Sequence, residues 1–158
     1  MRSNQAEAKL KAQGLFLPIK PDIEIPDLPT DITELDDDSL MELFVILTGW
    51  SDHISAQVAV AMVDEREAQR DVDVAEAQAM VRHWKGGSGD RVAIVKAQIA
   101  ADPDVIELHD HLEERYAYRK LVEVLANNID RDAALVSREL TRRTSGDTYK
   151  GRGRKFQA

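Results

Sequence analysis

The sequence predicts an all-α protein built on one long antiparallel helical hairpin, with a short N-terminal helix, a proline-rich extended strap and a basic disordered tail. Apolar residues recur at steps of three and four along two long stretches that have no internal proline. A glycine-rich segment separates these stretches, so they can fold back on one another. Aromatic residues make up only 5% of the 158 residues, which suits thin helix–helix seams.

Residues 1–14 are predicted to form the short N-terminal helix, because residues 4–13 favour helix, Asn4 can cap them and Gly14 can end them. Residues 15–38 form a proline-rich acidic segment in which Pro18, Pro21, Pro26 and Pro29 alternate with large apolar residues. This segment is either a strap that docks on a neighbouring surface, such as another subunit, or a floppy linker.

The hairpin core is predicted to span residues 39–144. Its first helix begins at a capping box formed by Ser39 and Glu42 and can run to Lys85. One step of the apolar pattern is skipped, at Asp64-Glu65. The residues expected on the seam are Leu43, Leu47, Trp50, Ile54, Val58, Ala61, Ala68, Val72, Ala75 and Ala79.

The reversal is predicted at the glycine-rich residues 85–90, followed by a short helix over 91–101. Asp102 and Pro103 then form the start of the last helix. Its expected seam residues are Val105, Leu108, Leu112, Tyr116, Val122, Leu125, Ile129, Ala133, Val136 and Leu140. One hairpin seam cannot cover both apolar stripes and the strap, so we expect a homo-oligomer.

Charge is distributed unevenly within the formal net charge of −8. Nine acidic residues and no basic ones lie between Asp22 and Glu42, whereas seven basic and two acidic residues lie between Arg138 and Lys155. This asymmetry indicates an interaction protein with a polyanion-binding end, or else solvated charge that keeps a helical protein soluble.

No catalytic or metal-binding motif is present. The chain has no cysteine, which favours a cytoplasmic setting. It also lacks a phosphate loop, a nucleophile elbow and an H-E-x-x-H motif. His109 and His111 cannot share a helix face, although His109 and Glu113 can supply half of a site. We therefore expect no enzyme activity, no cofactor and no metal, and no apolar run of about 20 residues suggests a membrane span.

The best functional candidate is the basic tail, residues 145–158, because single-strand binding requires cations along the backbone and rings for stacking. Trp84, at the hairpin tip, either stacks a base or caps the hairpin. The alternative is a disordered, solubilising end. The candidate nucleic-acid-binding residues are Arg82, Lys85, Arg91, Arg138, Arg142, Arg143, Tyr149, Lys150, Arg152, Arg154, Lys155 and Phe156.

The order of these features over about residues 40–143 resembles the phage recombination mediators of the UvsY type. The similarity rests on the reversal at His83-Trp84-Lys85-Gly86, the restart at 101–106 and a last helix that closes on Arg138, Arg142 and Arg143. Members of that family are small helical proteins that form rings, bind single-stranded DNA and help to load a recombinase onto strands coated by a single-strand-binding protein.

One departure from the family concerns a Lys-Ala-Arg cluster implicated in strand binding, where this chain has Gln78-Ala79-Met80. Arg82, Lys85 and Arg91 lie nearby and can substitute. The resemblance implies a recombination mediator that binds single-stranded DNA in the cytoplasm of an infected bacterial host, with a recombinase or single-strand-binding protein as a partner. The alternative is a phage scaffold, structural protein or adaptor that acts only through helical protein contacts.

Overall fold

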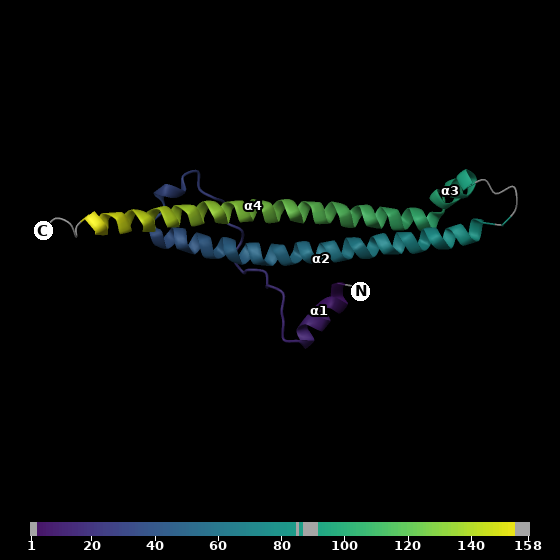
Figure 1. Ribbon diagram of the computed structural model, residues 1–158, viewed down its shortest axis with the longest axis horizontal. Coiled ribbons are helices and arrows are strands. Elements are labelled where there is room, and N and C mark those ends of the chain that lie inside the picture. The colour runs from purple at the N-terminus through teal and green to yellow at the C-terminus, as the bar shows by residue number, and fades with distance from the viewer. Residues whose placement is uncertain (1–2, 85, 87–91, 154–158) are drawn as a thin grey trace. The chain divides into compact units, whose positions relative to one another are not determined.

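The computed structural model describes residues 3–84, 86 and 92–153, and side chains only as far as Ser145 in the last helix. The described residues contain helices and no strands, which confirms the all-α prediction (Figure 1). The elements are α1 (Ser3–Ala12), the short 3-10 helix η1 (Ile32–Glu34), α2 (Asp37–His83), α3 (Val92–Ala100) and α4 (Pro103–Gly153).

The chain forms two compact units, and α2 and α4 each contribute one half to both. Unit 1 comprises Met1–Phe16 and Gln57–Val122. It therefore contains α1, the second half of α2, α3 and the first half of α4. Unit 2 comprises Leu17–Ala56 and Glu123–Ala158, and it contains the proline-rich strap with the remaining halves of α2 and α4.

In unit 1, the segments of α2 and α4 pair in opposite directions. Glu65 contacts Arg119, and eleven residues later along α2, Glu76 Oε1 lies 3.1 Å from His109 Nε2. Across these contacts the residue number rises along α2 while it falls along α4, which indicates antiparallel packing. Beyond these pairs α3 closes a small three-helix core, whose buried members are Ala75, Ala79, Val95, Ile99 and Val105.

In unit 2, the first half of α2 and the second half of α4 are also antiparallel. Asp37 bonds to Arg143, and Ser51 Oγ donates to Asp130 Oδ1 at 2.5 Å. The apolar seam between these pairs is closely packed, because Leu40, Leu47 and Val136 are each 0% exposed. The 3–4 spacing predicted these helices correctly because every fourth or third side chain returns to the same face.

The start of α2 differs from the predicted capping box at Ser39 and Glu42. The structure places the cap at Asp36, whose Oδ1 accepts the Ser39 N–H at 2.7 Å, and α2 begins at Asp37. This hydrogen bond lowers the pKa of Asp36. The prediction was wrong because a run of three aspartates offers an earlier carboxylate, and Asp is as good an N-cap as Ser. The restart at Asp102 and Pro103 is confirmed, since Asp104 N–H donates to Asp102 Oδ1.

The end of α4 also differs from the prediction. A disordered tail was expected from residue 145, but the helix continues to Gly153. Adding a residue to an existing helix costs far less than starting one, so a long helix can extend through residues that would not fold alone. Residues 154–158 lie outside the described part of the chain.

Two expected seam residues are instead exposed, Tyr116 and Leu125, each to 49%. The 3–4 pattern of α4 passes through Arg119, whose side chain is only 15% exposed and which pairs with Glu65. Glu65 belongs to the step at which the apolar pattern of α2 is skipped. An ion pair therefore occupies the seam where the sequence lacks an apolar residue.

The strap docks on α2 of its own chain, in unit 2. Trp50 is 7% exposed, and its Nε1–H donates to the Ile23 carbonyl at 2.9 Å. His53 Nδ1 lies 3.0 Å from the Pro18 carbonyl. Pro21 packs beside Gly49, where an added Cβ would lie in ordinary van der Waals contact, 3.7 Å from Pro21 Cγ. The strap is thus held mainly through its backbone and prolines.

Replacing Trp50 with phenylalanine is expected to loosen the strap, because the ring remains apolar while the donor to Ile23 is lost. A hydrogen bond of this kind contributes about 1 kcal/mol. Hydrogen exchange read by mass spectrometry should show faster exchange in peptides covering residues 17–25, by roughly fivefold. Peptides from α3 serve as the internal control, and unchanged exchange in the strap would contradict this role for Trp50.

Candidate nucleic-acid interface

The basic end of α4 contains a network of ion pairs that the sequence did not predict. Glu139, 6% exposed, accepts hydrogen bonds from the guanidinium groups of Arg142, at 2.6 and 2.7 Å, and Arg143, at 2.8 Å. Arg143 also donates to Asp37 Oδ1 at 2.7 Å and to the carbonyls of Leu35 and Thr33. Arg143 therefore ties α4 to the acidic start of α2, whereas Arg142 pairs with Glu139 within α4.

The electrostatics of this network follow from its hydrogen bonds. Bonds from Arg142 and then Arg143 lower the pKa of Glu139 from 4.5 to about 2. The same carboxylate raises the pKa of Arg142, and Asp37 followed by Glu139 raises the pKa of Arg143. All three groups are charged at neutral pH and partly neutralise one another, which reduces the attraction of these arginines for phosphate.

Arg82, at the other end of α2, is similarly paired. Its guanidinium contacts Asp102 Oδ2 at 2.9 Å and Asp104 Oδ2 at 3.2 Å. His83 Nε2 lies 3.5 Å from the same Asp102 oxygen. Asp102, 9% exposed, therefore caps α4 and holds the end of α2 against it. Half of the Arg82 side chain remains exposed, so it can still face a ligand.

Arg138 differs from these three arginines. It is exposed, and no ion pair involves it among the described residues. Tyr149, Lys150 and Arg152 fall on the helical backbone of α4, but their side chains are not among those described. The other predicted nucleic-acid-binding residues lie outside the described residues, namely Lys85, Arg91, Arg154, Lys155 and Phe156.

The structure leaves Trp84 half exposed, at 50%. Its backbone N–H bonds to the Met80 carbonyl, which closes the last turn of α2. Half exposure of the indole is compatible with both predicted roles of Trp84, stacking on a base and capping the hairpin.

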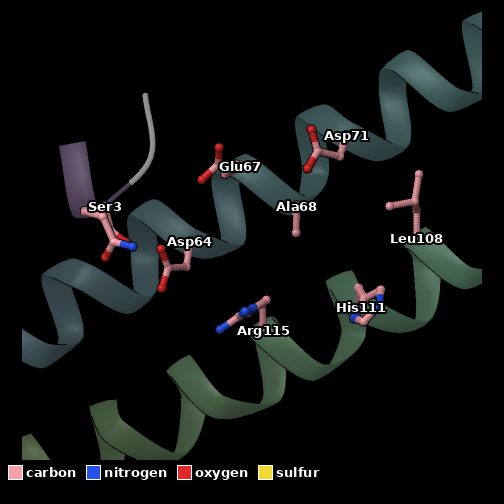
Figure 2. Close-up of a pocket in the computed structure, with 9 residues that line it drawn as sticks. Ser3, Asp64, Glu67, Ala68, Asp71, Leu108, His111 and Arg115 are labelled. Atoms are coloured by element: carbon pink, nitrogen blue, oxygen red, sulfur yellow. The ribbon is translucent and has the colours of Figure 1, made fainter. Parts of the chain in front are cut away.

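A polar hollow of about 390 Å³ lies in unit 1 (Figure 2). Asp64, Glu67 and Asp71 line it from α2, and His111 and Arg115 line it from α4. These carboxylates lie on successive turns, and within the described part of the chain no group of three or more ligands is placed to hold a metal ion. No buried side-chain polar atom lacks a partner there either. The hollow therefore has charged walls, but the described residues that line it are not arranged to hold a metal ion.

The histidines take part in side-chain contacts. His109 faces Glu76 across the helices, and the ring of His53 packs edge-on against Trp50 at 5.9 Å between centroids. His111 Nδ1 lies 3.6 Å from Glu114 Oε2. The half-site considered for His109 and Glu113 gains no third ligand among the described residues.

One described helix, α2, is long and apolar enough to cross a membrane by length and composition alone. It contains an 18-residue window of mean hydropathy 1.2, of which 22% is buried. Core helices of soluble proteins share this property, so it is weak evidence for a membrane span. The expectation of no membrane partner stays a prediction.

Glu139 and Asp37, and the pairing of Asp102 with Arg82, were not predicted from the sequence. Glu139 precedes Arg142 and Arg143 by three and four residues, a spacing that places all three on one helix face and was available as a signal. Comparison with protein-family models, with curated proteins and with solved structures finds no significant match to this chain.

Proposed function

We propose that this protein is a non-catalytic assembly protein that self-associates through its helical surfaces. The observation that supports it best is the area left exposed. Many large apolar side chains among the described residues are exposed to solvent, for example Phe16 at 74%, Val81 at 79% and Leu121 at 67%. Exposed apolar surface of this kind is typical of surfaces that contact another protein.

The exposed surface includes large apolar side chains on both long helices. On α2 within unit 1, Val63, Val74 and Val81 are 38–79% exposed and occupy one face, away from the buried seam. On α4, Leu121 is 67% exposed. Apolar faces of this extent are typical of protein contacts. The complete hairpin of residues 39–144 is, in this proposal, the assembly unit.

We further propose that the assembled protein binds single-stranded DNA as a phage-type recombination mediator, in the cytoplasm of an infected bacterial cell. The support is the resemblance to mediators and the run of cations and rings at the end of the chain. Because Arg82, Arg142 and Arg143 are paired internally, the cations and rings beyond Thr144 carry the binding site. Several copies of this segment in one oligomer would bind with avidity.

The alternative, a scaffold or adaptor that acts only through protein contacts, is favoured by the same pairing. Three of the four predicted cations with described side chains already contact carboxylates.

The chain is expected to bind a fluorescent single-stranded oligonucleotide at low salt and to lose affinity as salt rises. The slope should be about 0.7 log units per log unit of salt for each phosphate neutralised. A version ending at Thr144 is expected to bind at least about tenfold more weakly, since it lacks the cations and rings of the C-terminal segment. Fluorescence anisotropy measures both constants.

Two outcomes would change this assignment. No binding by the full chain at low salt would reject the mediator function and favour the scaffold. Undiminished binding by the truncated version would move the site to the hairpin tip near Arg82. Light scattering on the same samples tests assembly separately, and a monomer at micromolar concentration would contradict it.

A further inference from the structure

The strap presents an uncovered surface that is both apolar and acidic. Ile19, Ile23 and Ile25 are 87%, 57% and 42% exposed, and we call them the strap ridge. Between and beside them lie three exposed carboxylates, at Asp22, Glu24 and Asp27. Because the strap is anchored through the carbonyls of Pro18 and Ile23, its apolar side chains are free to contact another molecule.

The same unit has a second uncovered surface, of the complementary character. Val124, Arg131, Leu135 and Arg138 follow one another at steps of seven, four and three, so they lie on one face of α4, which we call the α4 outer face. Val124 is 56% and Leu135 40% exposed. The Arg131 side chain is 67% exposed and contacts only its neighbour Asp132 among the described residues.

We propose that the strap ridge of one copy docks on the α4 outer face of a second copy. Isoleucines would pack against Val124 and Leu135, and the carboxylates of the strap would face Arg131 and Arg138. This inference rests on the proposed self-association and names the surfaces that carry it. In a two-fold dimer the contact forms twice, because each copy supplies both surfaces.

A second copy of the chain is the expected partner, because each chain has both the strap ridge and the α4 outer face exposed. Within the chain the strap is bound to Trp50 and His53 on α2, so its ridge does not cover the α4 outer face. Pairing of two ridges is disfavoured, since three carboxylates on each would meet like charges.

Charge exchange tests the contact directly. One variant carries Asp22→Lys, Glu24→Lys and Asp27→Lys, and the other carries Arg131→Glu and Arg138→Glu. Each variant alone places like charges opposite one another across the contact. The dissociation constant of its oligomer should therefore rise by about tenfold or more. An equal mixture restores opposite charges at both contacts and should recover assembly. Light scattering and sedimentation measure the oligomer in all three samples.

The matched control is Lys9→Glu with Lys11→Glu, which changes charge equally on exposed α1 positions of unit 1 and should not alter assembly. Ile19→Ser with Ile23→Ser changes no charge and should also weaken assembly, which keeps the test valid if a charge variant misfolds. Normal assembly of the isoleucine variant, or no recovery in the mixture of folded variants, would overturn the docking. A monomeric wild-type chain would instead reject the proposed assembly itself.

Discussion

Replacing Leu47 with alanine is expected to lower the free energy of unfolding by about 3 kcal/mol. Leu47 is 0% exposed and lies on the seam of unit 2, where antiparallel halves of α2 and α4 meet. Truncation removes apolar contacts and leaves a cavity that two long helices cannot easily collapse, because each is held in register by pairs such as Ser51 with Asp130. Alanine does not weaken the helix itself, so the loss reports packing.

Urea unfolding followed by circular dichroism measures this effect as a lower midpoint at an unchanged slope. Met41→Ala is the matched control, since Met41 lies in the same helix and is 50% exposed. The Met41→Ala substitution should lower the free energy of unfolding by less than about 1 kcal/mol. If assembly covers Met41, this loss should depend on protein concentration. Equal costs for the two variants at low concentration would show that the seam is not where the structure places it.

Much of the fold could be predicted because its signals are local. A proline or glycine interrupts a helix wherever it falls, and apolar residues at 3–4 spacing identify a face without knowledge of the partner. Asp102 and Pro103 therefore marked the start of α4 correctly. The cap of α2 was misassigned because three aspartates in a row compete for that role, and only the folded backbone shows that Asp36 accepts the hydrogen bond.

Features that depend on two distant segments were not predictable in the same way. Tyr116 fits the apolar pattern of α4, but the seam passes through Arg119, because Glu65 lies opposite. The docking of the strap on Trp50 joins residues 27 positions apart through a backbone carbonyl, which leaves no trace in the side-chain pattern. The partner that Arg142 and Arg143 share, Glu139, lies on the same helix and could be found from its spacing. Asp37 and Asp102, the partners of Arg143 and Arg82, emerged only from the packing of α2 against α4.

The network around Glu139 is expected to give the protein a distinct acid sensitivity. The pKa of Glu139 is about 2 in the folded protein, against an ordinary value of 4.5, so the folded state favours the charged carboxylate. A carboxylate with a lowered pKa stabilises the folded state at pH values above its ordinary pKa. This stabilisation is lost as the pH falls from about 4.5 to 2. Arg142 and Arg143, whose pKa values are raised by these carboxylates, keep their charges throughout this range.

Glu139→Gln should remove this contribution at neutral pH, because an amide cannot pair with two guanidinium groups, and Arg143 would keep only Asp37 and two carbonyls. The midpoint of thermal unfolding should fall by several degrees at pH 7, and the difference from the wild type should shrink as pH approaches 2. Asp31 and Asp36 also have lowered pKa values, each through a hydrogen bond that the variant keeps, so their acid response appears in both proteins and cancels in the difference. A difference that stays constant from pH 7 to pH 2.5 would mean that Glu139 acts by packing alone. Loss of the difference would instead identify the ion pairs of Glu139 with Arg142 and Arg143 as the source of the stabilisation.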